Sequence, residues 1–296
     1  MRRSIISLGL AAVFVLIWPA TALAATQPRL GTATSFAVLA GAGITNTGAT
    51  TITGDVGTFP TTSETGFASV TIAPPGVNHA GDAVTQGAKN DLVTAYVDAA
   101  NQTPCTTLTT LTAQNLTPGT YCFSSSAQLT GPLTLSGFGV YVFQIGSALT
   151  TASGSSVLLT NNAAACGVWW QVTSSATFGT GTSFQGTVMA LQSITMTTGA
   201  TLIGRALARN GAVTLDTNTI TTPAALCAGL PVTGAVPTPT PTPGVVPTPS
   251  VVPGSTGIPD ELMRGQFPWL LILAIGAGIG ATALGLSSRR RRRRQA

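Results

Sequence analysis

The sequence predicts a mainly β fold, a right-handed parallel β-helix (β-solenoid) with about three strands per coil and one α-helix packed alongside. Three observations lead to this prediction. Residues 174–222 repeat with a period of about eighteen, apolar and hydroxyl side chains alternate within each repeat, and one separate stretch has apolar residues at helical spacing.

The repeat consists of paired segments eighteen positions apart. Residues 175–178 correspond to residues 193–196, and a third copy begins near residue 212, one residue out of step until a corner restores the phase. Each unit of such a repeat buries its apolar side only by stacking on its neighbours. Residues 44–54 align without a gap with residues 194–204, so we expect the N-terminal coil to lie beside the C-terminal coils in one solenoid.

Short strands are expected on both sides of a Pro- and Gly-rich segment, residues 61–77, which we expect to form a loop or cap over one end of the solenoid. The expected strand-rich segments are residues 36–39, 43–52, 54–57, 129–135, 140–145, 148–159 and 168–172.

One amphipathic helix is expected at residues 80–101. Its apolar stripe recurs every three or four residues, and Pro104 lies just beyond its end. The side of the β-helix is the available partner for this stripe, which consists of Val84, Ala88, Leu92, Ala95 and Ala99.

The N-terminus has the features of a secretory signal peptide, residues 1–25. Two arginines precede an apolar run at residues 5–20, and Ala22-Leu23-Ala24 is a small-x-small cleavage signal. An uncleaved N-terminal anchor is the alternative. The exported solenoid domain is then expected to comprise residues 26–229.

The C-terminal region predicts a single membrane span at residues 268–286, which contain no charged residue; about 20 apolar residues cross a bilayer. Six arginines at residues 289–294 follow, within an Arg-rich tail of residues 287–296. Because cationic flanks remain in the cytoplasm, we expect the solenoid outside the cell and the C-terminus inside. The arginine run is interpreted as a stop-transfer signal and not as a nucleic-acid site.

Residues 230–267 form a Pro- and Thr-rich linker, which is expected to be an extended spacer that carries the domain away from the membrane. Within it, residues 230–234 (Leu-Pro-Val-Thr-Gly) resemble a sortase sorting signal, which implies attachment to a cell wall. About 33 residues separate this motif from the predicted span. A plain membrane anchor is therefore the preferred interpretation.

The exported domain is sparsely charged. Its four cations and six anions give a net charge near −2, so nucleic acid is excluded as an expected partner. These ten residues are Arg29, Lys89, Arg205, Arg209, Asp55, Glu64, Asp82, Asp91, Asp98 and Asp216.

Four cysteines lie in the exported region, where disulfides persist. Four cysteines allow three connectivities, of which we favour Cys105–Cys122 and Cys166–Cys227. No CxxC motif occurs, and no metal site or cofactor is predicted.

No enzymatic constellation stands out. The only histidine, His79, has no Ser or Cys nucleophile motif around it, and a loop or capping role is preferred for it. Asp55 and Asp216 would meet only if the N-terminal and C-terminal coils stack, which leaves a glycosidase-like pair as a minor alternative. The sequence therefore predicts a non-enzymatic protein.

Threonines on stacked strands form a grid of small, rigid hydroxyl and methyl groups. Neighbouring strands lie about 4.7–4.9 Å apart, and same-face side chains along a strand about 6.6–6.8 Å apart. These spacings are close to those of water oxygens on ice planes, so such a face can carry an ordered layer of water that merges with ice. The alternative is that threonine is simply a good strand residue.

Several motifs jointly cover the exported domain: residues 30–40 (LGTATSFAVLA), 44–48 (ITNTG), 54–57 (GDVG), 117–123 (TPGTYCF) and 204–215 (GRALARNGAVTL). Through them the chain from about residue 30 to 223 resembles the ice-binding protein family built on a discontinuous β-solenoid with an α-helix alongside. The resemblance implies this fold, with the N-terminal coil placed beside the C-terminal ones, and a protein that adsorbs to ice.

The family's ice face often carries Thr-(Ala/Gly)-x-(Thr/Asn) on successive coils. Residues 47–50 and 198–201 match it fully, residues 180–183 end in Ser, and residues 151–154 and 217–219 depart from it. The resemblance therefore implies an ice-binding site formed by Thr47, Thr50, Thr151, Thr180, Ser183, Thr198, Thr201, Thr217 and Thr219.

The function expected from the sequence is adsorption of a cell-surface protein, monomeric in its exported part, to an ice crystal. The alternative is a surface adhesin that binds polysaccharide or another cell with the same scaffold.

Overall fold

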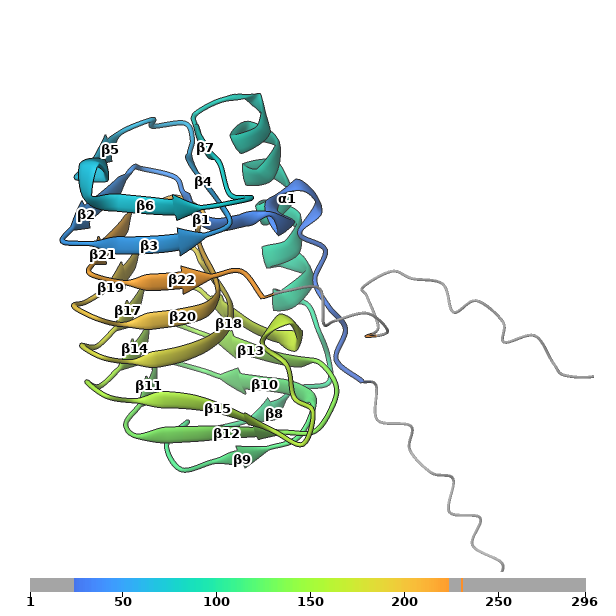
Figure 1. Cartoon of the computed structure of the whole chain (residues 1–296). Coiled ribbons are helices and arrows are strands. Elements are labelled where there is room, and N and C mark those ends of the chain that lie inside the picture. Colours follow the sequence, from blue (N-terminus) through green and yellow to red (C-terminus); the bar gives the residue numbers. More distant parts are fainter. Residues whose placement is uncertain (1–23, 224–229, 231–296) are drawn as a thin grey trace, which may run out of the picture. The chain divides into compact units, whose positions relative to one another are not determined.

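A computed structural model describes residues 24–223 and residue 230 of the chain. In this part the chain winds into stacked coils of parallel strands with one long helix, α1 (Ala83–Ala100), along one side (Figure 1). The predicted mainly β solenoid with an adjacent helix is confirmed. We describe the coils as three walls: the helix wall, the motif wall and the ladder wall.

The ladder wall is a seven-stranded sheet. Its strands, in spatial order, are β5 (Glu64–Thr65), β2 (Ile44–Thr47), β21 (Val213–Asp216), β19 (Ile194–Met196), β17 (Ala176–Phe178), β14 (Leu149–Thr151) and β11 (Ala127–Leu129).

The other two walls belong to one continuous sheet that bends round a corner. β18 (Ser183–Ala190) and β20 (Thr201–Ala208) run through this corner at Gly186 and Gly204. The first residues of β20 pair with β22 and its later residues pair with β1, so each long strand contributes to both walls. Gly186 has φ +107°, and a Cβ on Gly204 would lie 1.9 Å from the Gly186 carbonyl oxygen, so the corner requires glycine.

The motif wall comprises the first halves of β20 and β18 with their neighbours. These neighbours are β6 (Val70–Ala73), β3 (Thr50–Thr53), β22 (Thr219–Thr221), β15 (Ser156–Thr160), β12 (Pro132–Ser136) and β9 (Asn115–Leu116).

The helix wall comprises the second halves of β20 and β18 with their neighbours. These are β7 (Asn78–Ala80), β4 (Asp55–Thr58), β1 (Phe36–Ala40), β16 (Val168–Val172), β13 (Tyr141–Ile145), β10 (Gly119–Phe123) and β8 (Thr106–Thr107). Three short 3-10 helices complete the described elements: η1 (Gly31–Thr34), η2 (Phe67–Ser69) and η3 (Ala165–Gly167).

The N-terminal coil stacks directly on the C-terminal one. Strand β2 pairs with β21, β3 pairs with β22, and β1 pairs with β20. This arrangement confirms the prediction from the gapless match between residues 44–54 and 194–204. Residues 168 or 169 positions apart in sequence, such as Val38 and Ala206 or Ile44 and Val213, are thus neighbours in one continuous wall.

The interior of the coils is filled with apolar side chains. The rings of Tyr121, Phe143 and Trp170 stack through the middle, with 4.0 Å between the ring centres of Phe143 and Trp170, and Phe184 packs at a tilt against Trp170. Each fully buried large apolar side chain contributes about 1.5–3 kcal/mol relative to an exposed one. A stack of this kind makes the walls stiff, which fixes the positions of the side chains on their outer surfaces.

Helix α1 begins after Asp82, whose side chain accepts a hydrogen bond from the Thr85 backbone N–H, and it ends four residues before Pro104. Four residues of the predicted stripe are buried against the helix wall, but Val84 is exposed. Lys89, which is not a residue of the predicted stripe, is buried as well. The buried side of the helix is therefore rotated from the expected one.

Polar anchors explain why Lys89 faces the wall. Its Nζ donates to the carbonyl oxygens of Ala208 and Arg209 at 2.6 and 2.5 Å. Tyr96 donates to the Val172 carbonyl, and Gln144 donates to the Ala99 carbonyl at the end of the helix. These contacts fix α1 on the helix wall.

The disulfide Cys105–Cys122 is present, as predicted. Cys166 is also disulfide-bonded, whereas Cys227, the partner predicted for it, lies outside the described residues.

The predicted signal peptide, linker, membrane span and Arg-rich tail all fall outside the described residues. Among residues 24–223, no helix is long and apolar enough to cross a membrane; the predicted span at 268–286 is not among the residues searched.

Candidate functional site

The open walls carry the predicted site. On the motif wall, register places one outward hydroxyl side chain of each strand above that of the next, over six neighbouring strands. This column, which we call the motif column, consists of Thr71, Thr51, Thr219, Thr201, Ser183 and Ser156. All but Ser156 are exposed.

A second outward position on the same strands is less regular. It carries Thr53 and Thr221 on two strands, then Ile203 and Gln185 on the next two. Ile203 and Leu158 of this wall are each 46% exposed. The motif wall is therefore hydroxyl-lined along one column and mixed along the other.

The corner between the ladder wall and the motif wall holds four more of the predicted residues. Thr47, Thr180, Thr198 and Thr217 are all exposed there. The glycines that follow Thr180 and Thr198 have φ +65° and +71°, which lets the chain turn sharply from one wall to the next. Successive corners therefore present threonines in similar positions.

Asp216 orients two of these corner threonines. Its carboxylate accepts hydrogen bonds from the hydroxyls of Thr198 and Thr217, the second at 3.1 Å. Its backbone N–H donates to the Asn218 side-chain oxygen at 2.7 Å. A charged acceptor shared by two hydroxyls restricts their rotamers, so the corner is held in one arrangement.

Two predicted site residues lie inside the solenoid. Thr50 is 1% exposed and Thr151 is 7% exposed, so neither reaches the surface. Thr50 accepts a hydrogen bond from the Asn218 backbone N–H, and Thr151 is hydrogen-bonded to the Thr182 hydroxyl at 2.8 Å. Both threonines are internal polar links between coils.

The misplacement of Thr50 has a simple cause. The short motif at residues 47–50 matches residues 198–201 at an offset of 151, but strand register follows the offset of 150 and places Thr51 beside Thr219, level with Thr201. Because strand side chains alternate, a slip of one residue turns a side chain from the surface to the interior. Thr51 was therefore missed, although the gapless alignment contained the signal for it.

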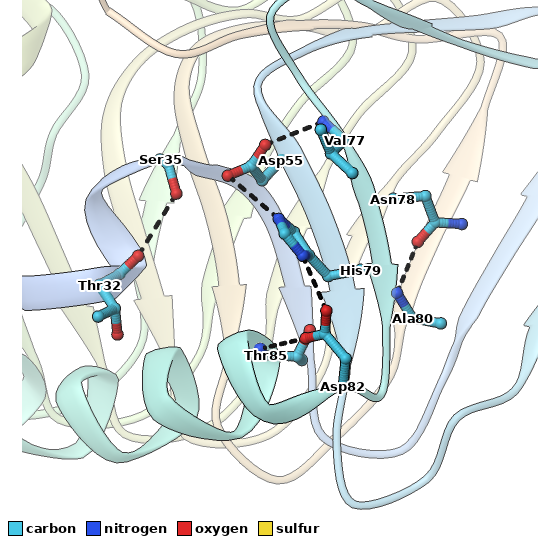
Figure 2. Close-up of polar contacts among 9 residues, drawn as sticks. All are labelled: Thr32, Ser35, Asp55, Val77, Asn78, His79, Ala80, Asp82 and Thr85. Atoms are coloured by element: carbon cyan, nitrogen blue, oxygen red, sulfur yellow. Dashed lines mark hydrogen bonds and ion pairs between the residues drawn. The ribbon is translucent and has the colours of Figure 1, made fainter.

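The structure separates the two carboxylates considered as a catalytic pair. Asp55 lies on the helix wall, where it accepts from the Val77 backbone N–H at 2.9 Å, and Asp216 lies at the end of β21 on the ladder wall. His79 lies between Asp55 and Asp82: its Nε2 is 3.6 Å from the Asp55 carboxylate and its Nδ1 is 3.0 Å from the Asp82 carboxylate (Figure 2).

This histidine cluster joins three elements of the fold. Asp82 caps α1, Asp55 belongs to β4, and His79 belongs to β7 (Figure 2). The Thr85 backbone hydrogen bond lowers the pKa of the Asp82 carboxyl, with a smaller contribution from His79. The cluster therefore links Asp82, the N-terminal cap residue of α1, to strands β7 and β4. This agrees with the loop or capping role preferred for His79.

A solenoid with one wall covered by a helix and hydroxyl-lined open walls defines a class of protein that binds with a broad, level surface. Comparison with known proteins identifies the family. The family model described as "Ice-binding-like" matches residues 38–221. The chain belongs to this family.

Relatives and solved structures agree. An "Ice-binding protein" of Nostoc sp. (strain HG1) is 50% identical over 67% of this chain and 76% of its own length. One of Colwellia sp. is 36% identical over 66% of this chain and 83% of its own length. A crystal structure of an ice-binding protein from an Antarctic biological consortium has a TM-score of 0.66 and 47% identity, and covers 70% of this chain and 96% of its own.

Proposed function

We propose that the exported domain adsorbs to ice through the motif column and the corner threonines beside it. The observation that carries the proposal is the register of exposed Thr and Ser side chains on neighbouring strands of the motif wall. Ice is proposed as the ligand because the chain belongs to the ice-binding-like family and its relatives include ice-binding proteins.

The geometry supports adsorption without chemistry. Hydroxyl groups spaced about 4.7–4.9 Å apart anchor water by hydrogen bonds, and the methyl groups between them order the water around them. Each contact is weak, so affinity depends on many of them acting together on a rigid surface. The apolar interior and the disulfide supply that rigidity before ice is met.

The surface expected to face ice consists of the exposed predicted residues and two that the register adds. The predicted ones are Thr47, Thr180, Ser183, Thr198, Thr201, Thr217 and Thr219, and the added ones are Thr51 and Thr71.

We further propose that the domain is displayed at the cell surface. The support comes from the sequence: a signal peptide at residues 1–25, an apolar run at residues 268–286 and an Arg-rich tail. The motif at residues 230–234 makes attachment to a cell wall the alternative to a plain membrane anchor. An ice-adsorbing domain on a Pro- and Thr-rich spacer would hold the cell to ice.

Nothing among the relatives favours the alternative of a polysaccharide or cell adhesin. The two functions are separated by thermal hysteresis and ice recrystallisation measured on purified residues 26–238, kept oxidised. Ice growth that is unaffected at high protein concentration would rule out ice adsorption.

A paired variant tests the site. T201Y/T219Y places two rings in the middle of the motif column, on neighbouring strands, and is expected to reduce thermal hysteresis. The control is T94Y, which changes an exposed threonine of α1, the helix that packs on the helix wall and not on the motif wall. Equal hysteresis in the two variants would show that the motif column is not the site.

A further inference from the structure

The ladder wall carries a column of threonines more regular than the motif column. Register pairs six of them across six neighbouring strands, with no other residue type between them. This column, which we call the threonine ladder, consists of Thr65, Thr45, Thr214, Thr195, Thr177 and Thr150.

Strand alternation turns these threonines outward. On five of the strands the residue just before the threonine is apolar and buried: Ile44, Val213, Ile194, Ala176 and Leu149. The threonines themselves are exposed or half-exposed. A side chain in the middle of a stacked column is only half-exposed, because its neighbours above and below shield it.

The positions beside the ladder keep the wall level. Two residues before each threonine the chain has only small side chains: Ser63, Gly43, Ala212, Ser193, Ser175 and Ala148. The motif wall, in contrast, exposes Ile203 and Leu158 next to its column. On this flank the ladder wall therefore has smaller side chains than the motif wall, and its seventh strand continues the column with Gln128.

Nothing in the described part of the chain lies over this wall. Helix α1 packs on the helix wall, through β16, β1, β13 and β7. The charged residues on strands of the ladder wall are Glu64 at its end, where it accepts a hydrogen bond from Asn78, and Asp216 at the corner. A wide, uncharged grid of hydroxyl and methyl groups suits a neutral, repeating ligand.

We propose that the threonine ladder is a second ice-adsorbing surface, joined to the motif wall at the corner of Thr47, Thr198 and Thr217. This inference rests on the proposed function, because it assigns the same ligand to another wall. The two surfaces face different directions, so they bring different ice planes, or two separate crystals, within reach of one molecule. The ladder adsorbs to ice independently of the motif column.

Four variants of residues 26–238 test the proposal: T201Y/T219Y on the motif column, T195Y/T214Y on the ladder, the two pairs combined, and the control T94Y. Thr195 and Thr214 are paired neighbours in the middle of the ladder. Thermal hysteresis gives the strength of adsorption. The pattern of fluorescently labelled protein on a single ice crystal shows the planes that are bound.

If the two surfaces act independently, removing one of two similar areas lowers adsorption by about half. We expect T195Y/T214Y to lose about half of the hysteresis and a subset of the labelled planes, T201Y/T219Y to lose another subset, and the combined variant to lose all. Circular dichroism and thermal unfolding verify the fold. If T195Y/T214Y is unfolded, the single variant T195Y replaces it.

The outcomes separate the two proposals. A ladder variant equal to T94Y in hysteresis and in labelled planes would refute the second surface and leave the motif column intact. Complete loss in T201Y/T219Y alone would refute it too, because the ladder would then not adsorb by itself. An unaltered protein that does not act on ice would instead refute the proposed function itself.

Discussion

Asp216 offers the sharpest single-residue test of the corner. In D216A the hydroxyls of Thr198 and Thr217 lose their shared acceptor. If each side chain then samples its three staggered rotamers equally, the arrangement seen here falls to about one ninth of the population. Adsorption that depends on both threonines should weaken by up to that factor.

The cost in stability is expected to be smaller. Asp216 is half-exposed, so each of its two hydrogen bonds contributes about 0.5–1 kcal/mol to the free energy of unfolding, the lower part of the usual range. A loss of about 1–2 kcal/mol lowers the Tm of a domain of this size by about 2–8 °C. Below 0 °C, where hysteresis is measured, the variant remains folded.

The assay compares thermal hysteresis and Tm of D216A, D216N and the unaltered protein. D216N keeps one side-chain oxygen as an acceptor and should give intermediate hysteresis. A D216A protein with lowered Tm but full hysteresis would contradict the reasoning, since it would show that the corner threonines need no fixed orientation to work.

Three further predictions follow from the geometry. T51Y should lower hysteresis as T201Y does, because both residues lie in the motif column, whereas T50A should lower Tm and leave hysteresis unchanged at temperatures where it is folded. Burial raises the pKa of Tyr141 to about 12, with a smaller contribution from Tyr121. Because the unfolded chain ionises near its ordinary pKa of about 10, the stabilisation is present below pH 10 and is lost between pH 10 and 12. Urea unfolding at pH 9 and 11 should show this loss, and Y141F should reduce it; an equal loss in both proteins would argue against the assignment. Replacing both Cys105 and Cys122 with serine should lower the free energy of unfolding by about 3 kcal/mol, the value for a loop of this length. Urea unfolding measures this change, and an unchanged urea midpoint would contradict the prediction.

The general form of the fold could be predicted because it follows from periodic patterns in the sequence. An eighteen-residue repeat, strand alternation and the match between residues 44–54 and 194–204 are all visible in the sequence, and each corresponds to a strand pairing. The helix was recognisable in the same way. Its orientation was not, because Lys89 is drawn to two backbone carbonyls of the wall, a contact that no periodicity in the helix reveals.

The candidate site could be predicted by residue type but not by every position. A four-residue motif shared by residues 47–50 and 198–201 suggests the wrong partner for Thr201, since the structure aligns it with Thr219 and Thr51. The threonine ladder was missed for a different reason. Four of its members, Thr177, Thr195, Thr214 and Thr45, occupy equivalent places in the repeats and in the match of residues 44–54 with 194–204, so the signal was present. The short motif at the corners drew attention away from it.

The corner between β21 and β22 shows why register and surface are linked. From Met196 to Thr201 the chain takes five steps, but from Leu215, the partner of Met196, to Thr219, the partner of Thr201, it takes only four. The chain has one extra residue just before β21, since it takes five steps from Ala208 to Val213 but four from Ala190 to Ile194. The shorter corner compensates for this residue, so Thr219 returns to the motif column.

The shorter turn has a structural cost, because it places Thr217, a β-branched residue, at φ +54°. Asn218 holds the turn by donating to the carbonyl oxygens of Thr197 and Ala200, both at 3.0 Å. Asp216 and Asn218 are therefore the residues that keep the ladder and the motif column in step at the corner between β21 and β22, which is one residue shorter than the same corner in the two neighbouring coils.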